Sequence, residues 1–199
     1  MNLSRILLFA LCITTAQAQS PIQLIPQPVS VQPQSGVFTL TKATTIHYNQ
    51  ADGRAVAEML SQQLNGPTGF GLSAKSGTSG KIQLNLTSSP NAQLGQEGYT
   101  LDASPKGVTI TANRPAGLFY GMQTLTQLLP KEIEGKTAMT TAWTLPAVRI
   151  TDYPRFGWRG IMLDVSRNFF PKEDVKRYIA QLAKLKFNTF HWHLTDDNG

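Results

Sequence analysis

Residues 159–199 read RGIMLDVSRNFFPKEDVKRYIAQLAKLKFNTFHWHLTDDNG, and this stretch decides the fold of the C-terminal part of the chain. One short apolar strand is predicted at Ile161–Val165, interrupted by Asp164, and a second strand at Phe187–Leu194. The residues between them favour a helix. A strand, a helix and a strand in this short a stretch form a βαβ unit, whose strands we expect to be parallel neighbours.

The predicted helix begins near Pro171, because the fixed backbone angle of proline suits the first helical turn. Glu173 and Asp174 follow, and carboxylates are favourable near the positive end of the helix dipole. One apolar face then runs along the helix, made by Val175, Tyr178, Ile179, Leu182 and Leu185.

Polar side chains follow each predicted strand at its C-terminal end. Arg167 lies just past the first strand, and Asp196 and Asp197 lie just past the second. Neighbouring strands run roughly 4.8 Å apart, so Arg167 and one aspartate can meet on a common rim. In barrels and open α/β sheets this rim binds ligands. The alternative is an ion pair that only ties two loops together.

Asp196 and Asp197 are not predicted to act together as an acid/base pair. Catalytic carboxylates usually flank the reacting bond from different elements, about 5 to 9 Å apart. Adjacent residues that leave one strand diverge instead. At most one of the two aspartates is therefore expected to face a ligand.

His191 and His193 are two residues apart, so in a strand both face the same way while Trp192 faces the other. Such a pair is also a metal-ligand pattern. No cysteine, third histidine or glutamate lies close by on this second strand, and Asp164 would have to help. A histidine hydrogen-bonded to the rim carboxylates is the favoured interpretation.

The first 18 residues have the features of a secretory signal peptide. Arg5 supplies a positive charge, residues 6–13 form a short apolar core, and Ala16-Gln17-Ala18 is a small-x-small cleavage site. The apolar core is too short to span a membrane. Cleavage would remove Cys12, the only cysteine. We therefore expect an exported protein, periplasmic or extracellular, without disulfides.

Residues 19–150 are predicted to form a small α+β domain, a sheet with two helices. The first helix is expected after Asp52 as its cap and ends at Gly66-Pro67. The second begins at Pro115 and is closed by Pro130. The positions predicted to face the core are Val56, Met59, Leu60 and Leu64 in the first helix and Leu118, Met122, Leu125 and Leu129 in the second.

The strands of this domain are predicted from β-branched residues and alternation, at 37–40, 44–48, 81–86, 98–101 and 108–112. Residues 69–80 are expected to form a loop, and residues 140–153 an extended connector. The domain has no dense cluster of titratable side chains, and His47 stands alone in its strand. We assign it no chemistry.

The charge balance is basic, with 18 Lys and Arg against 12 Asp and Glu. No dense run of Lys or Arg exists, so the excess is interpreted as a solvated surface. Nucleic acid is therefore not an expected partner, and no segment of spanning length predicts a membrane protein.

The C-terminal stretch resembles the family 20 glycoside hydrolases, the β-N-acetylhexosaminidases. The residues that carry the resemblance are Trp158-Arg159-Gly160, residues 163–167 (LDVSR) and residues 191–197 (HWHLTDD). Residues 19–150 look like the N-terminal accessory domain of that family. The resemblance implies that residues 151–199 begin a catalytic TIM (β/α)8 barrel and form its first βαβ unit.

The same resemblance implies roles for three residues in binding the terminal N-acetylhexosamine of a glycan. Arg167 matches the arginine that hydrogen-bonds the sugar hydroxyls, Asp196 the aspartate that orients this arginine, and His193 a histidine that lines the pocket. Asn168 departs from the aromatic residue or histidine common at its position.

The family's mechanism is substrate-assisted, with the 2-acetamido oxygen as nucleophile and an adjacent Asp-Glu pair on a later barrel strand. No Asp-Glu pair occurs in these 199 residues. The chain is thus expected to be an N-terminal fragment of an exo-β-N-acetylhexosaminidase that holds no catalytic residue, needs no cofactor and is inactive alone. Two alternatives are a metal-dependent hydrolase using His191 and His193, and a non-catalytic carbohydrate-binding protein.

Overall fold

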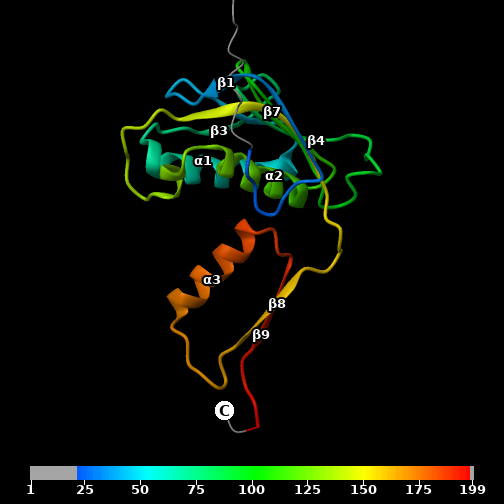
Figure 1. Cartoon of the computed structure of the whole chain (residues 1–199), viewed down its shortest axis with the longest axis vertical. Coiled ribbons are helices and arrows are strands. Elements are labelled where there is room, and N and C mark those ends of the chain that lie inside the picture. The colour runs from blue at the N-terminus through cyan, green and yellow to red at the C-terminus, as the bar shows by residue number, and fades with distance from the viewer. Residues whose placement is uncertain (1–21, 198–199) are drawn as a thin grey trace, which may run out of the picture.

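The computed structural model describes residues 22–197, which form a sheet domain followed by a smaller βαβ unit (Figure 1). The predicted signal peptide lies outside the described residues. The sheet domain holds a seven-stranded mixed sheet in the order β1-β7-β5-β6-β4-β2-β3. Its strands are β1 (Ser30–Thr39), β2 (Ile46–Tyr48), β3 (Ala74–Ser76), β4 (Ile82–Leu86), β5 (Tyr99–Ser104), β6 (Gly107–Ala112) and β7 (Thr144–Asp152).

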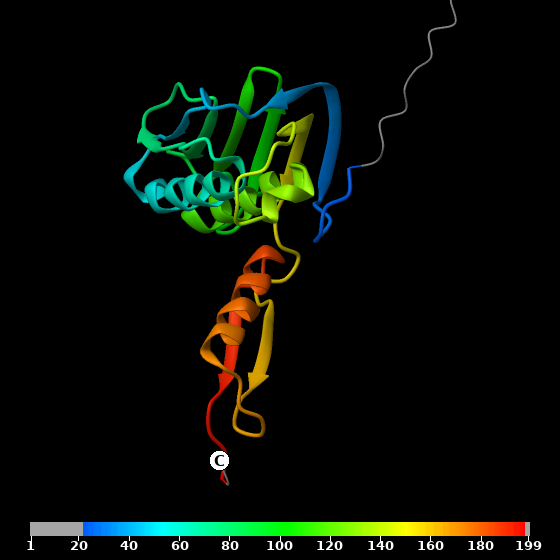
Figure 2. The same ribbon diagram turned by 90° about the vertical axis from the view of Figure 1, so that its left-hand side faces the viewer.

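Two helices, α1 (Arg54–Thr68) and α2 (Pro115–Leu128), cover one face of this sheet (Figure 2). Short 3-10 turns precede α1 (η1, Ala51–Gly53) and follow α2 (η2, Lys131–Glu134). Burial alternates along β4, β5 and β6, so every second side chain enters the core. Fully buried members of this core include Leu60, Leu84, Leu101, Ile110 and Leu118. The predicted sheet with two helices is confirmed.

Strand β7 lies within residues 140–153, where an extended connector was predicted, and that prediction was wrong. β7 lies inside the sheet, antiparallel to β1 on one side and to β5 on the other. Pro146 cannot donate a ladder hydrogen bond, and it pairs with Val37 next to an irregularity in β1 that begins after Pro33. Because of this proline, the sequence pattern did not indicate an inner strand, although the register of β7 with β5 is regular.

The first helix also differs from its predicted form. Asp52 lies in η1 and does not cap α1, whose N-cap is Gly53 without a side-chain hydrogen bond. Met59 is 46% exposed and so does not face the core. Pro67 is accommodated in the last turn, and α1 ends at Thr68. Its C-cap Gly69 adopts the left-handed conformation that glycine favours.

The predicted loop at residues 69–80 contains β3, a three-residue strand parallel to β2 at the edge of the sheet. Short edge strands carry little sequence pattern, which is why the composition of this segment indicated a loop instead.

The βαβ unit confirms the prediction from the opening stretch. It contains β8 (Gly160–Asp164), α3 (Lys172–Lys184) and β9 (Thr189–His193), and the two strands pair in parallel from Gly160↔Thr189 to Asp164↔His193. Both views show the unit projecting from the helix-covered side of the sheet domain, with the C-terminal ends of β8 and β9 farthest from that domain (Figures 1 and 2).

Helix α3 starts after Pro171, which occupies the N-cap position, and its apolar face is only half covered. Val175 and Leu182 are buried, whereas Ile179 and Leu185 are 42% and 40% exposed. None of the helices within residues 22–197 is long and apolar enough to cross a membrane.

Candidate functional site

Arg167 and Asp196 meet at the C-terminal ends of β8 and β9, as the spacing predicted. The guanidinium Nη2 of Arg167 donates to Oδ2 of Asp196 over 3.0 Å. Its Nη1 pairs with the carboxylate of Asp164, the last residue of β8. Arg167 therefore lies between two carboxylates, one from the end of each strand.

Asp164 organises the loop that carries Arg167. One carboxylate oxygen, Oδ1, accepts from the Ser166 hydroxyl over 2.7 Å, from the Ser166 amide over 3.0 Å and from the Arg167 amide over 3.3 Å. The Ser166 hydroxyl is the main reason that the pKa of the Asp164 carboxyl lies well below its usual range, and the bonds from Arg167 and His193 add to it. Asp164 thus stays ionised and holds Arg167 close to the end of the strand.

This role of Asp164 was not predicted from the sequence, where the residue only interrupts an apolar strand or could assist a metal site. The available signal was the spacing Asp164-x-Ser166, because aspartates commonly accept hydrogen bonds from the backbone two residues on.

His193 lies opposite Asp164 in the register of the two strands, and its Nδ1 is 3.2 Å from Oδ1 of Asp164. The predicted hydrogen bond from a histidine to a rim carboxylate thus takes another form, because the neighbour of His193 is Asp164 at the end of β8 and not Asp196 or Asp197. His191 lies opposite Met162 and is exposed. Within residues 22–197, the structure gathers no group of three or more His, Cys, Asp or Glu side chains suited to a metal ion.

The rim presents hydrogen-bond donors and acceptors to solvent. The side chain of Arg167 is 66% exposed, and guanidinium has five N–H donors, so donors remain after its two ion pairs. Asp196 is 43% exposed and offers acceptor capacity beside them. Asp197 does not share this pairing; its backbone amide donates to Oδ1 of Asp196 over 2.8 Å. One aspartate thus joins the arginine, as predicted.

Two family models match the chain, and together they cover nearly all of it. Glycosyl hydrolase family 20, domain 2, matches residues 21–153, and the catalytic domain of glycosyl hydrolase family 20 matches residues 156–199.

Similar sequences include a beta-hexosaminidase of Porphyromonas gingivalis, 37% identical over 179 residues that cover 88% of this chain and 23% of that protein. A beta-N-acetylhexosaminidase of Cellulomonas fimi is 34% identical over 184 residues, covering 89% of this chain and 35% of that protein. The chain thus spans about a quarter to a third of the length of these relatives.

Similar solved structures include the Streptomyces plicatus N-acetyl-beta-hexosaminidase in complex with Thio-NAglucal. It shares 44% identity and a TM-score of 0.83, over 88% of this chain and 35% of that one. The exo beta-N-acetylglucosaminidase of Vibrio harveyi, in complex with N-acetylglucosamine, shares 34% identity and a TM-score of 0.73, over 88% of this chain and 26% of that one.

Proposed function

The chain belongs to glycosyl hydrolase family 20, and we propose that it supplies the accessory domain and the sugar-holding rim of an exo-β-N-acetylhexosaminidase. The substrate would be a glycan that ends in N-acetylhexosamine. Relatives named beta-hexosaminidase and a neighbour solved with N-acetylglucosamine support this substrate class. The alternatives of a metal-dependent hydrolase and of a carbohydrate-binding protein without activity are not favoured.

The observation that carries the proposal is Arg167 held between Asp164 and Asp196 at the C-terminal ends of two parallel strands. A (β/α)8 barrel places its ligand at this end of its strands. We propose that β8, α3 and β9 are the first βαβ unit of such a barrel. Residues 151–199 would then begin the catalytic domain, and residues 19–150 would form the accessory domain. The end of β7 at Asp152 supports a junction in this region.

In this proposal the residues of the rim grip the terminal sugar. Arg167 donates hydrogen bonds to its hydroxyls, Asp196 holds the guanidinium in position and accepts from the sugar, and His193 lines the pocket while bonded to Asp164. A charged donor is well suited to this task because its hydrogen bonds are stronger than neutral ones.

Bond cleavage would follow the substrate-assisted route of the family. The acetamido oxygen of the bound sugar attacks its anomeric carbon to give an oxazolinium intermediate, and a glutamic acid protonates the departing oxygen. Water then opens the intermediate with the same glutamate as base. The Asp-Glu pair that this route needs is absent from these 199 residues, so their contribution is to hold the sugar.

Residues 1–18 support the further proposal that the protein is exported to the periplasm or the extracellular space.

The test uses the full-length protein that contains this chain, with an aryl N-acetyl-glucosaminide as substrate. Arg167→Ala is expected to lower kcat/KM by about 10- to 150-fold for each hydrogen bond lost, since a bond to a charged group contributes about 1.5–3 kcal/mol. Arg177→Ala is the matched control, because Arg177 is 79% exposed on α3 and its one ion pair within residues 22–197 is with Asp174. Unchanged kcat/KM in Arg167→Ala would refute the proposed role.

A further inference from the structure

The ammonium group of Lys186 enters the sheet domain although the residue belongs to the βαβ unit. Its Nζ donates to Oδ2 of Asp152 over 2.8 Å and to the hydroxyl of Tyr99 over 2.9 Å. Tyr99 begins β5 and Asp152 ends β7, and the two residues are paired across these strands. We propose that Lys186 is an interdomain tether, which fixes the start of β9 to the end of the sheet.

The ion pair between Lys186 and Asp152 is largely buried, so its geometry must be precise. Lys186 is only 7% exposed, and its side chain meets an Asp152 side chain that is 13% exposed. Burial lowers the pKa of Lys186, and Asp152 opposes that shift. A buried ion pair adds little net stability because both charges lose their water, but it tolerates few geometries. The contact therefore sets the orientation of the two units more than their affinity.

The backbone of Lys186 gives a second, independent indication. Lys186 follows the C-cap Leu185 of α3 and adopts a φ of 62°, the left-handed conformation in which helices usually place glycine. If this position served only to end the helix, glycine would serve it with less strain. The presence of a lysine in that conformation indicates that its side chain is needed.

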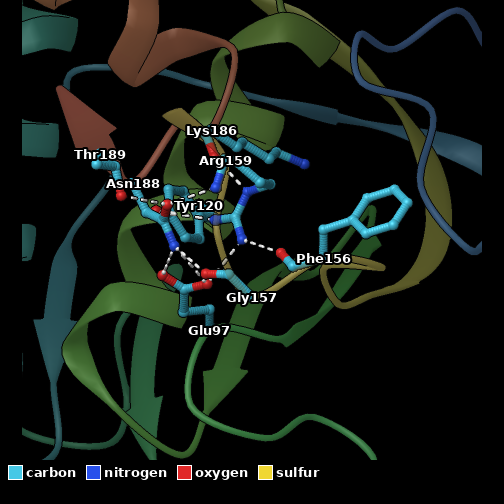
Figure 3. A network of polar contacts seen from close by, with 8 residues as sticks. All are labelled: Glu97, Tyr120, Phe156, Gly157, Arg159, Lys186, Asn188 and Thr189. Atoms are coloured by element: carbon cyan, nitrogen blue, oxygen red, sulfur yellow. Dashed lines mark hydrogen bonds and ion pairs between the residues drawn. The ribbon is translucent and has the colours of Figure 1, made fainter. Parts of the chain in front are cut away.

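A second set of contacts surrounds the tether (Figure 3). Arg159 Nε donates to the carbonyl oxygen of Lys186 over 2.9 Å, and its Nη1 donates to Glu97 of the sheet domain over 2.9 Å. Arg159 Nη2 also donates to the Tyr120 hydroxyl over 3.2 Å. Asn188 Nδ2 donates to the same Glu97 carboxylate over 3.2 Å.

These contacts lie at one end of the βαβ unit. Arg159 directly precedes β8 and Asn188 directly precedes β9, so the sheet domain holds the N-terminal ends of both strands. Arg167 and Asp196 lie past the opposite ends. The tether thus fixes the unit without occupying the rim, and it is independent of the proposed glycosidase function.

The experiment measures 15N relaxation of the 199-residue chain, with separate rotational correlation times for residues 30–152 and 160–193. In the wild type the two values are expected to agree, because the units tumble as one body. In Lys186→Met and Lys186→Gly the value for residues 160–193 is expected to fall below that for the sheet domain. Loss of native amide shifts confined to residues 160–193 in these variants would equally show that the unit depends on the tether.

Lys184→Met is the matched control, since Lys184 also reaches the sheet domain, through Glu134, but by a pair whose side chains are 34% and 50% exposed. This variant is expected to keep equal correlation times. Equal times in both Lys186 variants would overturn the proposal, and so would separation of the units in Lys184→Met. If Lys186→Gly raised the melting temperature and kept equal correlation times for the two units, Lys186 would only end α3 and the proposal would fail.

Discussion

The sheet domain and the βαβ unit differ in how completely they bury their apolar side chains. In the sheet domain, Leu84, Leu101 and Ile110 are fully buried between the sheet and its two helices. In the βαβ unit, α3 buries only Val175 and Leu182. Met162 of β8 and Trp192 of β9 are 51% and 45% exposed. The first region has a core of its own, whereas the second has a regular backbone but little core.

Regular hydrogen-bonded secondary structure can therefore form where no closed core surrounds it. The β8–β9 ladder is regular over its five pairs, so local sequence suffices to define it. Two strands and a helix still provide too few neighbours to cover both faces of a parallel sheet, which normally needs helices or strands on each side.

The largest effect should come from a cavity in the sheet domain. Leu101→Ala is expected to lower the free energy of unfolding by about 2–5 kcal/mol, because it empties space in a close-packed core. Ile179→Ala on α3 is expected to change it by about 0.5 kcal/mol or less, since its side chain is already partly solvated. Urea denaturation followed by the fluorescence of buried Trp143 provides the measurement. Equal losses in the two variants would mean that the βαβ unit has a core comparable to that of the sheet domain.

An intermediate effect is expected where the two regions meet. Glu97→Ala leaves Arg159 and Asn188 without their shared carboxylate and should cost about 2–3 kcal/mol in urea denaturation, because Arg159 is only 19% exposed. Asp102→Ala is the matched control, since it breaks the exposed Arg149–Asp102 pair within the sheet domain and should cost about 1 kcal/mol or less. A smaller loss in Glu97→Ala than in the control would contradict a structured junction.

The smallest effect concerns acid conditions at the rim. The Ser166 hydroxyl is the main reason that the pKa of Asp164 is lowered in the folded chain. The ionised carboxylate therefore stabilises the folded chain at pH values above the ordinary carboxyl pKa. This stabilisation is lost as the pH falls through the lower pKa of the folded chain. A 13C titration of the carboxyl carbon should show Asp164 still ionised at its ordinary pKa of 3.8. Ser166→Ala should move the midpoint upward. A midpoint at or above 3.8 in the wild type would contradict the arrangement.

The sequence predicted the elements whose pattern is local. The helix after Pro171 and the parallel pairing of its flanking strands follow from spacing within about 40 residues, and so does the meeting of Arg167 with Asp196. The position of β7 could not be predicted in this way. Its partners in β1 lie more than a hundred residues away, as the pair Ser30↔Thr151 shows, and Pro146 masks its alternation.

The contact between the βαβ unit and the sheet domain could not be predicted from the sequence either, for a different reason. Lys186 lies just past the C-terminus of α3, where lysines are ordinarily solvated. Its burial depends on Tyr99 and Asp152, which approach it only because β5 and β7 end side by side. A contact between two separately folded units leaves no periodic signal in either of them.

The place of β7 in the sheet has a consequence for biosynthesis. β1 occupies one edge of the sheet, and β7 is the strand that joins it to β5, although 104 residues separate the end of β1 from the start of β7. When only the first 140 residues have left the ribosome, β7 is absent and β1 has no neighbour that joins it to β5. Domains generally fold as units during synthesis, and pairings distant in sequence form slowly. We expect the first domain to close only as Asp152 emerges, immediately before β8 does, so that the next domain begins to fold on a completed neighbour.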